Sequence, residues 1–312
     1  MARLFRRSTP RNDVVASEAK QSLRSCEATL CITSSGNSCE TVQSIDVSLP
    51  DLDFTLVMLL AILALRNWVR RRTTGPAREV AMSDRGYVNP QLLWESVELH
   101  ARLNDPKLCL IDTRAGEEYS QGHIPGAQLF DLFGISLSDT DPAPLKAFSW
   151  MIEHLMHFRG VANDRTVVFY GDTSDVKAAR GFWFLEYFGH ADTHVLDGGI
   201  RAWQEAGYAV TSEAQMPRLT QYTATPQPQT LATYRDILER LDSSDVAILD
   251  TRGDEEYYGT TVRAARGGTI PGAIHLEWTH NLDKKGFFKP ASELRAQYEA
   301  VGITPDKEVV CF

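Results

Sequence analysis

The sequence predicts an α/β protein made of two copies of one module, each a mainly parallel sheet covered by helices, with the second copy incomplete. Short apolar runs alternate with segments of helical periodicity in both copies. One motif pair also occurs twice: Asp-Thr-Arg at 112–114 precedes Ile-Pro-Gly-Ala at 124–127, and the same letters recur at 250–252 and 270–273. The eight extra residues of the second copy fall between its motifs, where a surface loop tolerates insertion. A length of 312 residues agrees with about two domains of roughly 150 residues each.

The first copy is expected to begin with a helix. Asn89 suits the N-cap, Pro90 suits the first helical position, and the apolar positions continue to about Leu103. A strand over 108–111 then leads into the first motif, and the Ile-Pro-Gly segment predicts a turn. The later elements are expected to be a short strand near Leu129, a helix over 145–158, a strand over 166–170, a helix over 178–188, a strand at 195–196, and a helix over 200–206 that Gly207 ends.

A polar segment with three prolines, residues 212–231, predicts a linker between the two copies. The first domain is therefore assigned to 82–211 and the second to 232–312. The second domain is shorter than the first, and we expect it to be truncated. It should restart with a helix whose apolar face is made of Leu231, Tyr234, Ile237, Leu238 and Leu241.

Residues 1–81 differ from the rest of the chain. They are rich in polar residues without sustained periodicity, so we expect a disordered leader, or one that arises from a wrongly assigned start with Met82 as the natural first residue. A short apolar segment, 54–65, extends to 69 and has a basic flank, so a membrane anchor through 54–69 is an alternative. An Arg-rich targeting peptide at 1–24 is a further alternative.

Charge and cysteine usage exclude several classes of protein. The net charge is −9, with +3 over 1–81 and −12 over 82–312, and an acidic body without a basic stripe argues against nucleic-acid binding. Cys26, Cys31 and Cys39 have no fourth ligand nearby, so no metal site is expected. Cys109 lies in an apolar strand and is expected to be a buried core thiol. This usage suits a reducing cytoplasm.

The motifs together resemble a known family. The two motif pairs and the segment VLDGGIRAWQEAG at 195–207 are similar to those of the tandem-domain rhodaneses, which are thiosulfate and 3-mercaptopyruvate sulfurtransferases. The resemblance covers about residues 88–312. It implies a catalytically silent first domain and a second domain that supplies a cysteine just after a strand of the form Val-Val-x-Tyr/Phe.

The alignment of the two copies places that cysteine just after Phe312, at position 313. The first copy has Val-Val-Phe-Tyr at 167–170 followed by Gly171, and the second has Val-Val-Cys-Phe at 309–312, where the sequence ends. Cys311 therefore matches Phe169 within the strand, and we expect a buried strand residue there, with a nucleophile as the alternative. The 312-residue chain is expected to be inactive because it stops before the active-site loop.

The resemblance implies sulfur transfer without a cofactor. A cysteine thiolate takes sulfane sulfur from thiosulfate or 3-mercaptopyruvate, holds it as a persulfide and passes it to a thiol or cyanide acceptor. The sequence leaves the choice of donor open. It also leaves open a function of another class, that of a non-catalytic rhodanese-like module for binding or regulation.

Arg252 is the expected substrate-binding residue. It lies at the carboxyl end of a strand, where open α/β sheets bind ligands, and it can hold a sulfonate or carboxylate bidentately. The alternative is a structural ion pair with Glu255 or Glu256. Arg114, its counterpart in the silent copy, is expected to be structural.

Other polar residues near the motifs have simpler interpretations. Asp112 and Asp250 are expected to cap turns, and His123 to make a turn hydrogen bond. His154 and His157 have a spacing that suits a metal, but no accompanying Glu motif, so a packed or solvated helix face is expected.

Overall fold

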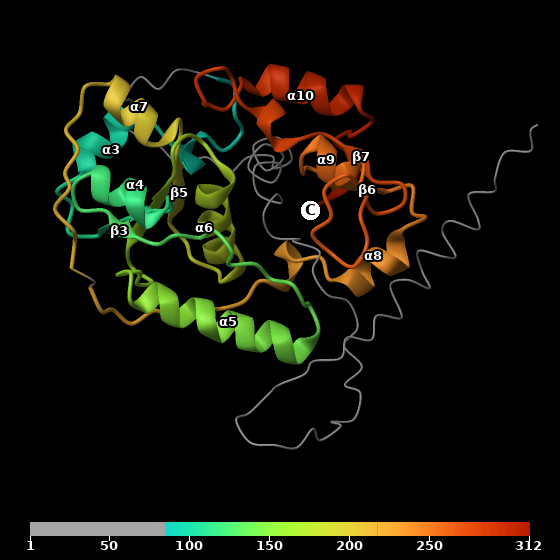
Figure 1. The fold of residues 1–312 in the computed structure, drawn as a ribbon, viewed down its shortest axis with the longest axis horizontal. Coiled ribbons are helices and arrows are strands. Elements are labelled where there is room, and N and C mark those ends of the chain that lie inside the picture. Colours follow the sequence, from blue (N-terminus) through green and yellow to red (C-terminus); the bar gives the residue numbers. More distant parts are fainter. Residues whose placement is uncertain (1–84, 217) are drawn as a thin grey trace, which may run out of the picture.

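The computed structural model describes residues 85–216 and 218–312, which form two α/β halves side by side (Figure 1). The first half contains a five-stranded sheet in the order β1-β5-β4-β2-β3, and every neighbouring pair is parallel. This confirms the predicted α/β class with helix-covered parallel sheets. The strands are β1 (Leu93–Trp94), β2 (Leu108–Asp112), β3 (Gln128–Leu129), β4 (Thr166–Tyr170) and β5 (Thr193–Leu196).

Helices cover both faces of this sheet, and the residues of β4 point alternately into two apolar cores. Val167 and Phe169 pack in one core with residues of α5 and α6, while Val168 and Tyr170 pack in the other with residues of α3 and α7. This alternation is the period of two that a strand imposes. The helices are α3 (Ser96–Arg102), α4 (Gly116–Gln121), α5 (Pro142–His157), α6 (Val176–Tyr187) and α7 (Gly199–Glu205).

The predicted helix from Asn89 to Leu103 is wrong in its first half. The 3-10 helix η1 (Pro90–Leu92) is followed by strand β1, and Asn89 makes no side-chain cap hydrogen bond. β1 pairs with β5, and Leu93 and Trp94 point into opposite cores. Pairing with a distant strand overrides the local helical periodicity here, so the helix begins only at α3.

The second half repeats the centre of the first. Its described sheet has the order β7-β6-β8, again parallel, and β6 pairs with β8 as β2 pairs with β4. α10 packs on one face of this sheet and α8 on the other. The elements are α8 (Tyr234–Arg240), β6 (Val246–Asp250), α9 (Asp254–Tyr257), β7 (Ile274–His275), the 3-10 helix η3 (Trp278–Asn281), α10 (Ala291–Ala300) and β8 (Glu308–Cys311).

The segment between the halves, predicted as a linker, is packed against the first half. Thr225 N donates to Phe188 O at 2.8 Å, and Gln227 N donates to Tyr187 O at 2.6 Å. Tyr222, 2% exposed, belongs to the core of the first half. A short 3-10 helix, η2 (Pro228–Thr230), then leads toward α8.

The two halves also meet at a buried carboxylate, that of Asp197. Its Oδ1 accepts hydrogen bonds from Ser174 Oγ at 2.6 Å and from Phe288 N at 3.0 Å, and its Oδ2 pairs with Arg85 Nη1 at 2.5 Å. Ser174 N donates to Gly286 O at 3.1 Å. Asp197 therefore joins the first half, the second half and the segment that precedes β1.

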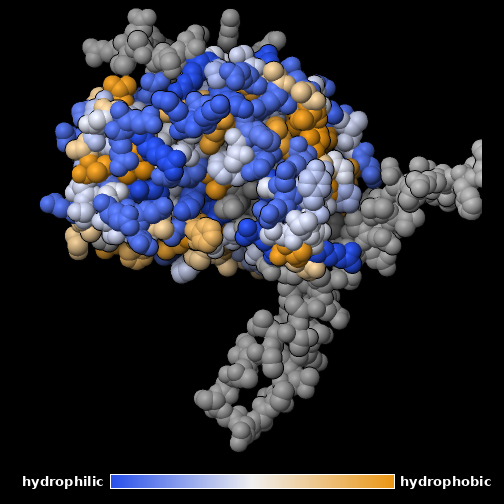
Figure 2. Space-filling model, turned by 45° about the horizontal axis from the view of Figure 1, so that its top comes forward, coloured by the Kyte–Doolittle hydropathy of each residue, from blue (hydrophilic) through white to orange (hydrophobic). Residues whose placement is uncertain are grey.

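The surface in Figure 2 is mainly hydrophilic, with separate apolar patches. Over 85–216 and 218–312, no helix combines the length and apolar character needed to cross a membrane. The leader and the segment 54–69 lie outside the described residues, so the predictions made for them stay predictions.

Candidate functional site

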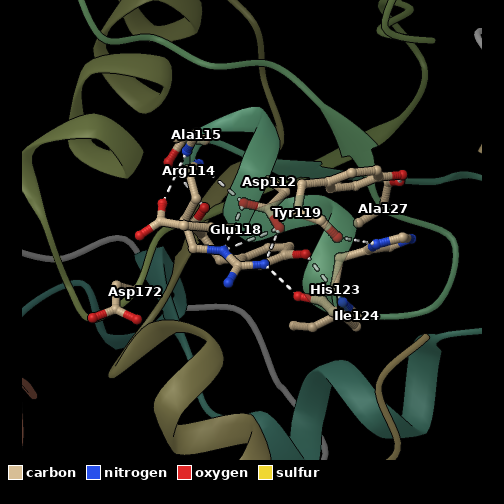
Figure 3. Close-up of polar contacts among 12 residues, drawn as sticks. Asp112, Arg114, Ala115, Glu118, Tyr119, His123, Ile124, Ala127 and Asp172 are labelled. Atoms are coloured by element: carbon tan, nitrogen blue, oxygen red, sulfur yellow. Dashed lines mark hydrogen bonds and ion pairs between the residues drawn. The ribbon is translucent and has the colours of Figure 1, made fainter. Parts of the chain in front are cut away.

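The first Asp-Thr-Arg motif forms a fork of ion-paired hydrogen bonds at the carboxyl end of β2 (Figure 3). Arg114 Nε donates to Asp112 Oδ1 at 3.0 Å, and Arg114 Nη2 donates to Asp112 Oδ2 at 2.6 Å. The same Nη2 donates to Gly122 O at 2.7 Å, and Arg114 N donates to Asp112 Oδ1 at 3.0 Å. Asp112 is fully buried, and the arginine supplies the partner that a buried carboxylate requires. The carboxylate caps the turn, as predicted.

The second motif repeats this fork with the same atoms. Arg252 Nε donates to Asp250 Oδ1 at 3.0 Å, and Arg252 Nη2 donates to Asp250 Oδ2 at 2.6 Å and to Gly268 O at 2.9 Å. The alternative, a structural ion pair of Arg252, is present, but the partner is the fully buried Asp250 and not Glu255 or Glu256 as expected. Glu256 pairs with Arg263. Whether Arg252 also binds substrate stays a prediction.

Each motif threonine fixes the end of the neighbouring strand. Thr113 N and Oγ1 both donate to Tyr170 O at 2.9 Å. Thr251 N and Oγ1 donate to Phe312 O at 3.0 and 3.1 Å. Phe312 is therefore the structural counterpart of Tyr170, and the position that follows it corresponds to Gly171.

The guanidinium groups lie near these strand ends. Arg252 Cζ is 5.1 Å from the centre of the Phe312 ring, and Arg114 Cζ is 5.9 Å from that of Tyr170. In Figure 1 the end of the chain is drawn between the two halves. Arg252 is thus close to the point at which the chain leaves β8.

Cys311 is a core residue of β8. It is 1% exposed, lies opposite Leu249 and packs with Leu294 and Tyr298. Burial raises the pKa of its thiol to about 12, so the thiolate is scarce at neutral pH. These features support the buried-strand interpretation over the nucleophile. Cys109 is likewise buried, as predicted, and burial raises its pKa to about 12 as well.

The loop after β4 contains a residue that the sequence reasoning missed, Asp175. Its carboxylate accepts hydrogen bonds from Asp172 N at 2.9 Å, Lys177 N at 2.9 Å and Ala178 N at 3.1 Å. Burial raises the pKa of this carboxyl group, and the three backbone donors oppose that shift. The available signal was an aspartate directly before a helix, which is a typical N-cap.

The three histidines considered in the sequence make contacts with backbone carbonyl groups. His123 is buried between Tyr119 O (2.8 Å from Nδ1) and Glu213 O (3.1 Å from Nε2). On α5, the Nδ1 of His154 contacts Trp150 O, and His157 Nε2 contacts Tyr222 O. Within the described residues, no group of three His, Cys, Asp or Glu side chains is arranged to hold a metal ion.

Comparison with known proteins supplies the family. A model of the rhodanese-like domain matches residues 95–206 and 233–312, one segment in each half. The chain belongs to the rhodanese-like family. Both Asp-Thr-Arg forks lie within the matched segments, so they are parts of two rhodanese-like domains.

Several known proteins are similar to this rhodanese-like chain. The sulfur carrier protein TtuD of Thermus thermophilus is 35% identical over 243 residues, which cover 73% of this chain and 84% of that protein. The thiosulfate sulfurtransferase of Azotobacter vinelandii is 33% identical over 219 residues, covering 70% of this chain and 81% of that protein. The solved structure of the 3-mercaptopyruvate sulfotransferase SseA from Escherichia coli superposes with a TM-score of 0.62 at 27% identity, covering 70% of this chain and 87% of that one.

Proposed function

We propose that this protein is a sulfurtransferase that moves sulfane sulfur from thiosulfate or 3-mercaptopyruvate to a thiol or cyanide through a cysteine persulfide. The similar proteins with sulfurtransferase names support the reaction class. The observation that carries the proposal is the equivalence of Phe312 and Tyr170, because both carbonyl oxygens accept the same two hydrogen bonds from a motif threonine. This equivalence supports our proposal that the nucleophile occupies the position after Phe312.

The proposed reaction has two displacement steps. The cysteine thiolate attacks the outer sulfur of thiosulfate, a sulfur–sulfur bond forms, and the bond to the inner sulfur breaks so that sulfite leaves with the electron pair. Cyanide or a thiolate then attacks the terminal sulfur of the persulfide, takes that sulfur, and regenerates the cysteine thiolate. With 3-mercaptopyruvate as the donor, the leaving group is the enolate of pyruvate, which gains a proton.

We propose that Arg252 binds the negatively charged group of the sulfur donor. Its Nε and Nη2 are held by Asp250 and Gly268, while Nη1 donates to none of the described residues. The side chain is 12% exposed and lies beside Phe312. A preorganised guanidinium of this kind can donate to a sulfonate or carboxylate.

We infer the cellular compartment from the thiols and the class of partner from the charge. Cys109 and Cys311 are both free. We infer a reducing cytoplasm, in which such thiols persist. The acidic body, −12 over 82–312, favours small-molecule partners over nucleic acid.

Thiocyanate formation from thiosulfate and cyanide tests the proposal. A polypeptide of residues 1–312 should form no thiocyanate above background, because Gly171 has no thiol and Cys311 is buried. A polypeptide extended beyond Phe312 by a loop with a cysteine at the first position should form thiocyanate and carry a persulfide on that cysteine. Turnover by 1–312 that Cys311→Ser abolishes would show that the register is wrong by two residues. No turnover by either protein would favour the non-catalytic binding module.

A further inference from the structure

A histidine from the neighbouring strand bridges the turn that carries Arg252. His275, the last residue of β7, lies opposite Asp250 in the parallel register of β6 and β7. Its Nδ1 is 3.2 Å from Asp250 O, and its Nε2 is 2.8 Å from Oδ1 of Asp254, the first residue of α9. The imidazole therefore contacts the chain on both sides of Arg252, at the residues two before it and two after it.

The imidazole ring of His275 is itself held in place. Tyr257 of α9 stacks on it, with the ring centres 4.2 Å apart and the ring planes 14° apart. The His275 side chain is 15% exposed, whereas that of Asp254 is 74% exposed. Both hydrogen-bond partners are acceptors, so a ring that donates to both carries a proton on each nitrogen and a positive charge opposite the carboxylate. Stacking and ion pairing together hold α9 against the end of β7.

The first half has no polar side chain at either position of this bridge. Leu129 takes the place of His275 in the pairing of β2 with β3, and Gly116 takes the place of Asp254 after the repeated motif. These two positions are also neighbours, since a Cβ atom added at Gly116 would lie 3.6 Å from Leu129 Cδ2. The forks of the two motifs are alike. The bridge is therefore a feature that distinguishes the second turn from an otherwise similar first turn.

We propose that His275 is a positioning residue for the sulfur donor, because it fixes the turn from which Arg252 presents its guanidinium group. This inference rests on the proposed donor-binding role of Arg252. A guanidinium group that is fixed before the donor binds loses less conformational freedom on binding than one that must first be ordered. His275 acts through the turn and does not itself need to touch the donor.

Hydrogen exchange of arginine Nε–H groups with water, followed by NMR in the polypeptide of residues 1–312, tests the proposal. The Nε–H groups of Arg252 and Arg114 make equivalent hydrogen bonds of 3.0 Å to their motif aspartates, so Arg114 is an internal control. His275→Leu introduces the residue of the first half. Exchange at Arg252 should become about three- to tenfold faster, because the turn opens more often, while exchange at Arg114 stays the same. Loss of a signal in Arg252→Lys assigns it to Arg252.

Two further substitutions separate the bridge from a general loosening of the second half. His280→Leu replaces an exposed histidine of η3 and should leave both exchange rates unchanged. Asp254→Asn keeps an oxygen acceptor for the ring and should preserve most of the protection at Arg252, whereas Asp254→Gly should remove it. Unchanged exchange at Arg252 in His275→Leu, or equal acceleration at Arg114, would overturn the proposal. Equal effects of Asp254→Asn and Asp254→Gly would overturn it as well.

The effect on the donor is measured in the extended polypeptide that carries a cysteine after Phe312. There His275→Leu should raise the KM for thiosulfate about three- to tenfold and change kcat less, since donor binding is the step that Arg252 serves. An unchanged KM together with faster exchange at Arg252 would show that the bridge does not act on the donor. Absence of turnover in the extended parent would contradict the proposed function, while the exchange rates would still decide whether His275 fixes the turn.

Discussion

At the scale of single residues, the two described thiols define a test of the strand register. Burial raises the pKa of Cys109 and Cys311 from 9.0 to about 12. We expect iodoacetamide at pH 8 to leave both unmodified in the folded protein and to modify both after unfolding, as peptide mapping by mass spectrometry would show. Rapid alkylation of Cys311 in the folded state would mean that it faces the site rather than the core.

The same two groups contribute to stability in a pH-dependent way. Because the folded-state pKa lies above the unfolded value, the contribution is complete below about pH 9 and is lost as the pH rises toward 12. The sign of this dependence follows from proton binding. As the pH rises, the thiols of the unfolded chain lose their protons at a lower pH than those of the folded chain, so deprotonation favours unfolding. Cys311→Ala should therefore flatten the alkaline decline in the free energy of unfolding.

The two motif arginines form a natural pair of variants. Alanine at either position would leave a fully buried aspartate without its arginine partner. Lysine is the better substitution, because it keeps the positive charge but cannot form the two parallel hydrogen bonds to the aspartate. In the protein that carries the nucleophile, Arg252→Lys should lower donor efficiency by roughly ten- to hundredfold, about 1.5–3 kcal/mol for a lost charged hydrogen bond. The step from persulfide to acceptor should change less.

Arg114→Lys is the control for this prediction. It perturbs the same fork in the first domain, which we expect to be catalytically silent, so donor kinetics should be nearly unchanged. Equal effects of both substitutions, or no effect of either, would make Arg252 a purely structural residue. Steady-state rates at varied donor and acceptor concentrations separate these outcomes.

At the scale of secondary-structure elements, the strongly patterned segments were predictable. The apolar runs at β2, β4 and β5 and the glycine that follows α7 identified those elements, because burial and turn geometry there are local properties. β1 was missed because only its pairing with β5 makes it a strand. Asp175 was missed because the convergence of three amides depends on how the loop folds, which spacing alone does not show.

The segment between the halves, residues 212–231, should contribute to the stability of the fold because it is packed against the first half. Tyr222 is 2% exposed in the core of the first half, so Tyr222→Ala removes a buried aromatic ring and should cost about 3 kcal/mol or more in the free energy of unfolding. Tyr258→Ala, at a residue that is 72% exposed, should change it by less than about 0.5 kcal/mol. Urea denaturation of both variants provides the comparison. A loss at Tyr222 no larger than at Tyr258 would mean that the segment is a loose linker in solution.

At the scale of the whole molecule, the halves are joined by one buried and one exposed polar contact. Asp197 is buried and accepts hydrogen bonds from Ser174 and Phe288 as well as pairing with Arg85. Lys285 and Glu205, 3.5 Å apart, form an exposed pair across the same boundary. Because burial removes the competition of water, only the contact between Asp197 and Phe288 N should couple the halves strongly.

This difference gives the last prediction. Asp197→Ala removes the shared acceptor of both halves and should cost about 3–5 kcal/mol, the range for a buried pair that loses one partner. The loss should appear in calorimetry as a less cooperative transition, because Phe288 N of the second half loses its acceptor in the first half. Glu205→Ala should cost less than about 1 kcal/mol and leave a single transition. If Asp197→Ala unfolds as cooperatively and as late as Glu205→Ala, the halves are joined by their apolar contacts rather than by the buried carboxylate.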